Sequence, residues 1–126
     1  MSTRALIGIE LNNGNYDVKS VYLHNAGGVE SAGRLLLEFY KTMESVVELI
    51  EGGDLSVLGE TLKECSFYKD RRGEDPALIV PTVHHKNVRS WPYMGAEYLY
   101  LFKPIENKWY VNMRGSTWFP LENWTE

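Results

Sequence analysis

Short β-forming segments that flank turn-forming residues constrain the fold of this chain more than any other feature. Residues 4–11 are mostly aliphatic, and the stretch Asn-Asn-Gly-Asn follows at positions 12–15. Asparagine and glycine tolerate the positive backbone φ that a tight reversal needs. Residues 16–24 are therefore expected to return as a second strand, so that the chain begins with a β-hairpin.

The last third of the chain repeats this pattern. Aromatic residues alternate with leucines from 98 to 102, which is typical of a strand with two different faces. A connection at residues 104–108 leads into residues 109–113, so a second hairpin is expected here. Trp118 and Phe119 are expected to form a last short strand or a packed tail.

Between the two hairpins the apolar spacing changes to a helical one. Residues 29–40 carry apolar side chains at intervals of three and four, which predicts a helix. Thr42 is placed to cap a second helix, although Ser45 occupies the position where a capping box ordinarily has Glu or Gln. The two glycines at 52–53 are expected to end that helix through a left-handed residue.

The segment after the helices contains turns and one further strand. Asp54 is expected to cap local backbone donors in a short ordered turn at residues 54–59. Residues 69–76 are strongly charged and contain Gly and Pro, which favours an exposed loop. Residues 77–83 are predicted to form a strand that Pro81 restricts to a sheet edge.

These elements predict one α+β domain over residues 1–126. Its expected architecture is a small, mostly antiparallel β-sheet with two helices packed on one side. A length of 126 residues matches one folding unit, and the contents of 44% apolar and 24% charged residues are typical of globular proteins. No repeat, low-complexity tract or linker suggests a second domain.

Charge and cysteine content exclude several classes of function. The formal net charge of -4 disfavours binding to long nucleic acids, which depends on clustered Lys and Arg. Cys65 is the single cysteine, so a disulfide within the chain and a multi-thiolate zinc site are excluded. Cys65 itself is expected to be a buried, small apolar residue.

Targeting signals are not evident at the start of the chain. The apolar stretch within residues 1–8 is too short for a signal peptide, and no later run has the length needed to span a bilayer. We therefore expect a mature cytosolic N-terminus and no association with membranes.

The glycine-rich turn before the first helix is a candidate anion site. Gly27 and Gly28 follow His24 and lead into the helix start, where backbone amides can hold a phosphate or a carboxylate. The segment lacks the Lys-Ser/Thr pair of a P-loop and the spacing of a dinucleotide fingerprint. Turn formation and helix capping are the structural alternative.

Arginines provide a second group of candidate anion ligands. Arg71 and Arg72 stand beside Glu74, and a guanidinium group offers a planar fork of donors that fits phosphate. A solvated loop is the alternative for this segment. Arg89 and Arg114 are weaker candidates of the same kind.

The histidines favour neither a metal site nor a complete catalytic set. His84 and His85 are adjacent, and neighbouring residues of a strand point to opposite faces, which disfavours joint metal ligation. A small hydrolase is an alternative function. It would use His24 or His85 with Glu30 or Glu74 in acid-base roles.

Aromatic residues are more numerous in the C-terminal third than a small core can absorb. Some are therefore expected at a self-association interface or stacked on a planar ligand. Tyr68 and Trp91 are the residues selected for stacking.

Several short motifs are spread over most of the chain. They are Thr3-Arg4 with Ile7-Gly8, Tyr22 and His24 before the glycine turn, Leu36-Leu37 with Tyr40, and the stretches 53–56, 67–74, 98–102 and 109–111. In these motifs the chain resembles a widespread group of small, largely uncharacterised phage and prophage proteins. Members of that group often carry an Asp-Gly-Tyr-Pro-like turn after the histidine, and this chain departs from it with Ala-Gly-Gly-Val at 26–29.

The resemblance implies a protein that counters host defence in the host cytoplasm. One mode is a sponge that buries a nucleotide-derived immune signal without cleaving it, as the oligomeric anti-Thoeris and anti-CBASS proteins do. The other is an inhibitor that covers a host enzyme, as anti-CRISPR proteins do, and such an inhibitor is expected to expose a flat apolar or acidic surface.

The working hypothesis is the sponge, a homo-oligomer without enzymatic activity, cofactor or metal. Its pocket is expected at the subunit boundary, where positive side chains and flat rings converge on a nucleotide-like small molecule. The residues assigned to that pocket are Arg71, Arg72, Gly27, Gly28, Tyr68, Trp91, His24 and Arg114.

Overall fold

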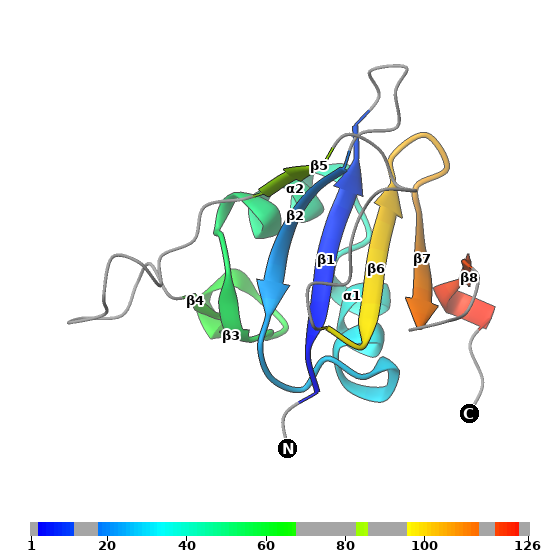
Figure 1. The fold of residues 1–126 in the computed structure, drawn as a ribbon. Coiled ribbons are helices and arrows are strands. Elements are labelled where there is room, and N and C mark those ends of the chain that lie inside the picture. The colour runs from blue at the N-terminus through cyan, green and yellow to red at the C-terminus, as the bar shows by residue number, and fades with distance from the viewer. Residues whose placement is uncertain (1–2, 12–17, 68–82, 86–95, 114–117, 124–126) are drawn as a thin grey trace.

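The structure is a computed structural model, and it describes residues 3–11, 18–67, 83–85, 96–113 and 118–123 (Figure 1). The described strands are β1 (Ala5–Glu10), β2 (Val18–Leu23), β3 (Leu55–Val57), β4 (Ser66–Phe67), β5 (Val83–His85), β6 (Tyr98–Lys103), β7 (Lys108–Met113) and β8 (Phe119–Pro120). The described helices are the π-helical turn Val29–Gly33, α1 (Arg34–Phe39), α2 (Met43–Glu51) and the short 3-10 turns Leu62–Glu64 and Leu121–Asn123.

The strands form one mixed sheet in the order β4-β3-β2-β1-β6-β7-β8, and β5 pairs with β2 beside this path. Strand β1 lies at the centre, antiparallel to β2 and parallel to β6. Strand β3 runs parallel to β2 because the helices between them carry the chain back to the same end of the sheet. The α+β class is confirmed. Among the described strands, five of the seven strand pairings are antiparallel and two are parallel, so the predicted mostly antiparallel sheet is only partly confirmed: the sheet is mixed, and it is larger than the small sheet that was predicted.

Both helices lie behind the sheet in Figure 1, on one of its faces. The main core is formed between them and that face, where Ile7, Leu36 and Leu49 belong to one buried cluster. The opposite face has its own buried cluster, which includes Leu6, Leu99 and Leu101. Central strands that are buried on both faces need nearly continuous apolar sequence, and residues 5–9 of β1 are all buried.

Helix α2 has the boundaries that its sequence predicts. The Thr42 hydroxyl accepts a hydrogen bond from the Ser45 amide at 3.1 Å, and the Ser45 hydroxyl accepts one from the Thr42 amide at 3.2 Å. Serine therefore completes the capping box in place of Glu or Gln. The helix ends at Gly52, and Gly53 adopts the left-handed conformation with φ 83°.

Asp54 holds two distant segments together, which corrects the prediction that it caps local donors. Its Oδ1 accepts a hydrogen bond of 2.8 Å from the Tyr22 amide. The outer edge of β2 pairs with β5 at residues 18–20 and with β3 at Leu23, so the Tyr22 amide falls between these two partners. The carboxylate thus satisfies a backbone donor at a break in the sheet, a role that residue spacing alone does not reveal.

The C-terminal hairpin has the predicted alternation. Tyr100 and Phe102 of β6 face the helices, while Leu99 and Leu101 face the other side of the sheet. Strand β7 pairs antiparallel with β6, and the indole N–H of Trp109 donates to the Tyr40 carbonyl at 2.8 Å. The predicted last strand is present as β8, at Phe119–Pro120.

Three sequence predictions lie outside the described residues. They are the turn at 12–15, the charged loop at 69–76 and most of the predicted strand at 77–83, of which only Val83 is described, as the first residue of β5. The predicted helix at 29–40 is present in two parts, because a π-helical turn at Val29–Gly33 precedes α1.

Candidate functional site

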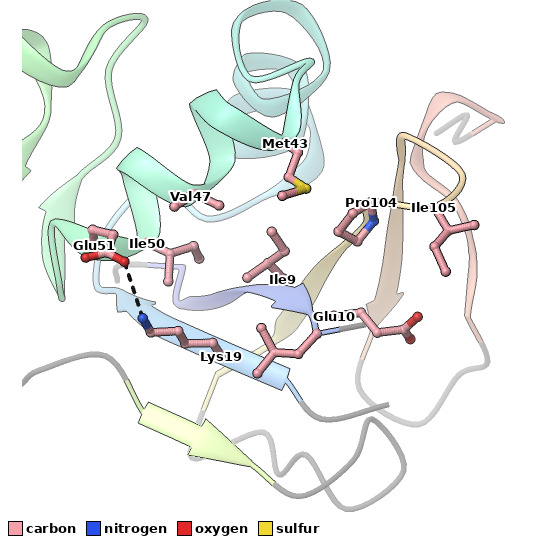
Figure 2. Close-up of a pocket in the computed structure, with 10 residues that line it drawn as sticks. Ile9, Glu10, Lys19, Met43, Val47, Ile50, Glu51, Pro104 and Ile105 are labelled. Atoms are coloured by element: carbon pink, nitrogen blue, oxygen red, sulfur yellow. Dashed lines mark hydrogen bonds and ion pairs between the residues drawn. The ribbon is translucent and has the colours of Figure 1, made fainter. Parts of the chain in front are cut away.

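An apolar groove of about 480 Å³ lies between α2, the ends of β1 and β2, and the turn that joins β6 to β7 (Figure 2). The residues that line the groove are Ile9, Glu10, Leu11, Lys19, Met43, Val47, Ile50, Glu51, Pro104 and Ile105. A volume of this size lies within the range of ordinary ligand sites, roughly 300–1,000 Å³. The groove is therefore the candidate functional site.

Three structural elements place the apolar side chains around the groove. Met43, Val47 and Ile50 share one face of α2 because they are separated by four and three residues. Ile9 projects from the end of β1, and Ile105 extends from the opposite turn in Figure 2. The groove thus has a helical wall, a floor at the sheet and a third side formed by the turn.

Two of the apolar side chains in the groove are unusually exposed. Met43 is 54% exposed and Ile105 is 78% exposed. Scattered apolar surface residues need no explanation, but these two line the same hollow, and contiguous exposed apolar surface is characteristic of binding sites.

The polar groups of the groove lie at its margin. Lys19 Nζ forms an ion pair with Glu51 Oε1 at 3.4 Å, as the dashed line in Figure 2 shows. Both side chains are more than one third exposed, so solvent screens their attraction. Glu10 adds a second carboxylate. The lining therefore contains two carboxylates and one ammonium group that already has an anionic neighbour.

Helix α2 carries an acidic stripe beside the apolar face that lines the groove. Glu44, Glu48 and Glu51 follow one another at intervals of four and three residues and are exposed. Each lies one position after Met43, Val47 or Ile50, so the acidic stripe is rotated by about 100° from the apolar one. The last turn of the helix contains no basic residue.

A second, smaller hollow of about 240 Å³ lies on the C-terminal hairpin and α1. Its lining includes Lys41, Lys108, Trp109 and Glu122. Lys108 Nζ contacts Glu122 Oε1 at 3.0 Å, and this hydrogen bond raises the pKa of the lysine. A carboxylate of the same chain thus already pairs with this lysine, and the hollow has about half the volume of the groove.

The glycine turn assigned to the ligand pocket lies at the other end of β1 and has a structural role. The Gly27 amide donates to the Thr3 carbonyl at 3.0 Å, and the Gly27 carbonyl accepts from the Tyr100 hydroxyl at 2.7 Å. The Gly28 carbonyl accepts from the amides of Ser31 and Gly33. The Gly27 amide, which an anion site would need, is therefore engaged within the fold.

The conformation of this turn also differs from the usual glycine pattern. Ala26, not a glycine, has a positive φ of 55°. A Cβ on Gly27 would lie 2.9 Å from the Cβ of Ala5 and 3.0 Å from the Thr3 carbonyl oxygen. Close approach to β1 is thus the physical requirement for glycine at position 27.

His24 lies directly after β2, beside β3, and is half-buried. Its amide donates to the Leu55 carbonyl at 3.1 Å, and its ring lies 4.6 Å from the Tyr22 ring. It does not line the groove. Of the residues assigned to the predicted ligand pocket, the structure describes His24, Gly27 and Gly28. They lie near the end of β1 that is opposite the groove.

The other residues assigned to the sponge pocket lie outside the described residues. They are Arg71, Arg72, Tyr68, Trp91 and Arg114. The same holds for Glu74 and Arg89, while His84 and His85 are described only as part of the backbone of β5.

Cys65 is buried, as predicted. Its sulfur accepts a hydrogen bond from the Gly59 amide at 3.3 Å and lies 3.4 Å from the Tyr40 hydroxyl. Burial and the neighbouring thiol raise the pKa of Tyr40, whose hydroxyl donates to the Gly59 carbonyl. These contacts fasten the segment after β3 to α1.

Sequence reasoning did not select any residue that lines the groove. Val47 and Ile50 belong to the apolar pattern of α2, and residues 104–108 were expected to form a connection. The available signal was Met43 and Ile105, two apolar residues at a helix start and in a turn. Spacing does not show that they border one hollow, because the tertiary fold brings them together.

Within the described ranges, no group of three His, Cys, Asp or Glu side chains is arranged to hold a metal ion. None of the helices in this part of the chain is long and apolar enough to cross a membrane. Comparisons with known proteins give no match among family models, curated proteins or solved structures.

Proposed function

We propose that this protein acts by binding a partner protein, with the apolar groove as its docking site and without chemistry of its own. A single observation carries the proposal: Met43 and Ile105 stay exposed although both line one hollow whose other apolar residues come from α2 and β1. An apolar segment that enters the groove would remove these side chains from water, at roughly 25 cal/mol per Å² of apolar area.

The polar composition of the groove favours a protein segment over a phosphorylated ligand. A nucleotide phosphate needs several unpaired donors, whereas Lys19 is the one cation among the described lining residues and it pairs with Glu51. Glu10 and Glu51 would repel a phosphate. An apolar core with a charged margin is the ordinary composition of a protein interface.

The proposal corresponds to the second mode that the phage resemblance implies, an inhibitor that covers a defence protein. Sequestration of a nucleotide-derived signal depends on arginines and aromatic residues outside the described residues, and it stays a prediction. The small hydrolase also stays a prediction, since the side chain of His85 is not described and Glu74 lies outside the described residues.

Site-specific photo-crosslinking tests the proposal. A photoreactive amino acid replaces Ile105 in one variant and Met43 in another, and the cells that carry the gene are irradiated. We expect both positions to form an adduct with the same protein. The same label at Leu62, which is 36% exposed and does not line the groove, serves as the matched control.

The identified protein is then purified and its binding to the full chain is measured. We expect Ile105→Asp to lower the affinity by at least about 100-fold, because a carboxylate replaces an apolar contact residue at an interface. Unchanged affinity would contradict the proposal. An intact metabolite that is released on heating, and whose retention does not depend on Ile105, would support the sponge instead.

A further inference from the structure

The distribution of charge around the groove distinguishes between classes of partner. On the α2 side, the acidic stripe of Glu44, Glu48 and Glu51 lies beside the apolar wall. On the β1 side, Glu10 belongs to the lining. Of the lining residues that the structure describes, Lys19 is the only basic one, and it forms an ion pair with Glu51.

The lysines of the neighbouring elements lie beside the Tyr110 ring or line the second hollow. Lys103 lies over the ring of Tyr110, at 4.7 Å from its centroid, and Lys108 lies 5.9 Å from the same ring. Lys41 lines the second hollow together with Lys108. Among the described residues, the ion pair between Glu51 and Lys19 is the one that the acidic stripe forms.

An apolar groove with an acidic stripe beside it is complementary to a segment that is apolar on one side and basic on the other. Groove-binding helices place their apolar residues at intervals of three and four and leave the intervening positions for charge. Charge complementarity of this kind mainly sets partner choice and association rate, because mismatched charges at the margin are strongly unfavourable.

We propose that the groove takes a basic amphipathic segment of its partner, with aliphatic side chains between Met43 and Ile105 and Lys or Arg side chains against Glu44 and Glu48. This inference rests on the proposed function, since it specifies the partner of the same groove. It makes a separate prediction, namely that binding depends on the sign of charge of the partner.

Two model peptides test the inference with the full chain. One is a short helical peptide of Leu and Lys, and the other has the same pattern with Glu in place of Lys. Affinities are measured by fluorescence anisotropy at low and at high salt. We expect the Leu/Lys peptide to bind at least about 10-fold more tightly, with the preference falling as salt screens the charges.

Charge variants show whether the acidic stripe causes that preference. Glu44→Lys together with Glu48→Lys is expected to reverse it, so that the Leu/Glu peptide binds more tightly. The matched control is Glu60→Lys with Glu64→Lys, which changes the same number of exposed carboxylates away from the groove lining and is expected to keep the original preference. Circular dichroism checks that each variant is folded.

Each outcome separates the two proposals. Reversal of the preference supports the basic partner. If both peptides bind equally and Ile105→Asp abolishes both, the basic partner is wrong and the docking groove stands. If neither peptide binds, or if Ile105→Asp changes nothing, the basic partner is wrong, and the crosslinked partner then decides the proposed function by itself.

Discussion

The two ends of strand β1 differ in their surroundings: one end is packed against a turn, and the other borders an open groove. At Ala5, the glycine turn packs against the strand. The Gly27 amide donates to the Thr3 carbonyl, and the Gly27 carbonyl accepts from the Tyr100 hydroxyl. At Ile9 and Glu10, the strand borders an open apolar groove. The glycine-rich turn therefore makes contacts within the fold, while α2 and the turn between β6 and β7 border the groove.

Stability should be more sensitive to added side-chain volume at the Ala5 end of β1, where the glycine turn packs, than at the groove end. Gly27→Ala is expected to lower the free energy of unfolding by about 2–3 kcal/mol, because its Cβ would overlap Ala5 and the Thr3 carbonyl. Urea unfolding measures the loss. Gly28→Ala is the matched control, since its Cβ would meet only the flexible Glu30 carboxylate at 3.2 Å. Equal losses in both variants would contradict a packing role specific to Gly27.

The hydrogen bond that closes this end can be removed with little change in shape. Tyr100→Phe leaves the buried Gly27 carbonyl without its hydroxyl donor and is expected to cost about 1–2 kcal/mol. Tyr110→Phe serves as the control, because the Tyr110 hydroxyl bonds to Glu106 at an exposed position. Thermal and urea unfolding should rank the two variants in this order, and the reverse order would break the comparison.

Asp54 is expected to make the free energy of unfolding depend on pH. Its partner Tyr22 pairs with Leu6, near the Ala5 end of β1. Burial raises the pKa of its carboxyl, while the hydrogen bond from Tyr22 lowers it less. In the window between the ordinary aspartate pKa and this raised value, the folded state binds more protons than the unfolded state. The free energy of unfolding is therefore expected to fall as the pH rises through that window.

Asp54→Asn should remove this component, because an amide keeps the acceptor for the Tyr22 amide without a charge. Asp54→Ala should cost about 1 kcal/mol at every pH, since the Tyr22 amide loses its partner. Urea unfolding of the three proteins over a pH series checks both expectations. If the free energy of unfolding changes with pH in the same way for the wild type and for Asp54→Asn, Asp54 does not contribute to the pH dependence.

Substitution of an exposed residue at the groove end of β1 should change the free energy of unfolding little. Ile105→Ser is expected to change the free energy of unfolding by less than about 0.5 kcal/mol, because Ile105 is exposed and packs little. The measurement is again urea unfolding, with Gly27→Ala as the reference. A loss above about 1 kcal/mol would show that Ile105 belongs to the core and not to a docking site.

Local sequence patterns predicted most of the elements. The alternation of β6, the hairpin with β7 and the Thr42 cap each depend on neighbours in the chain, so spacing was sufficient. The parallel pairing of β1 with β6 joins residues more than 90 positions apart, and the bond from Tyr22 to Asp54 spans 32 positions. Such contacts depend on the whole topology, which residue spacing does not specify.

The candidate site was less predictable than the fold. Gly27 and Gly28 were selected because glycine before a helix favours anion binding, but at position 27 close packing against Ala5 and Thr3 also requires glycine. Met43, Ile50 and Ile105 were not selected, because an apolar residue in a sequence does not reveal whether it is covered. Exposure is a property of the folded molecule, so the groove became recognisable only from the structure.

Methyl NMR of the isoleucine side chains tests the central claim most directly. Ile9, Ile50 and Ile105 line the groove, whereas Ile7 is buried outside its lining. When the Leu/Lys peptide or the crosslinked partner is added, the signals of Ile9, Ile50 and Ile105 are expected to shift and that of Ile7 to remain. Shifts confined to residues near Gly27, or saturable binding that leaves all three groove isoleucines unchanged, would contradict the account.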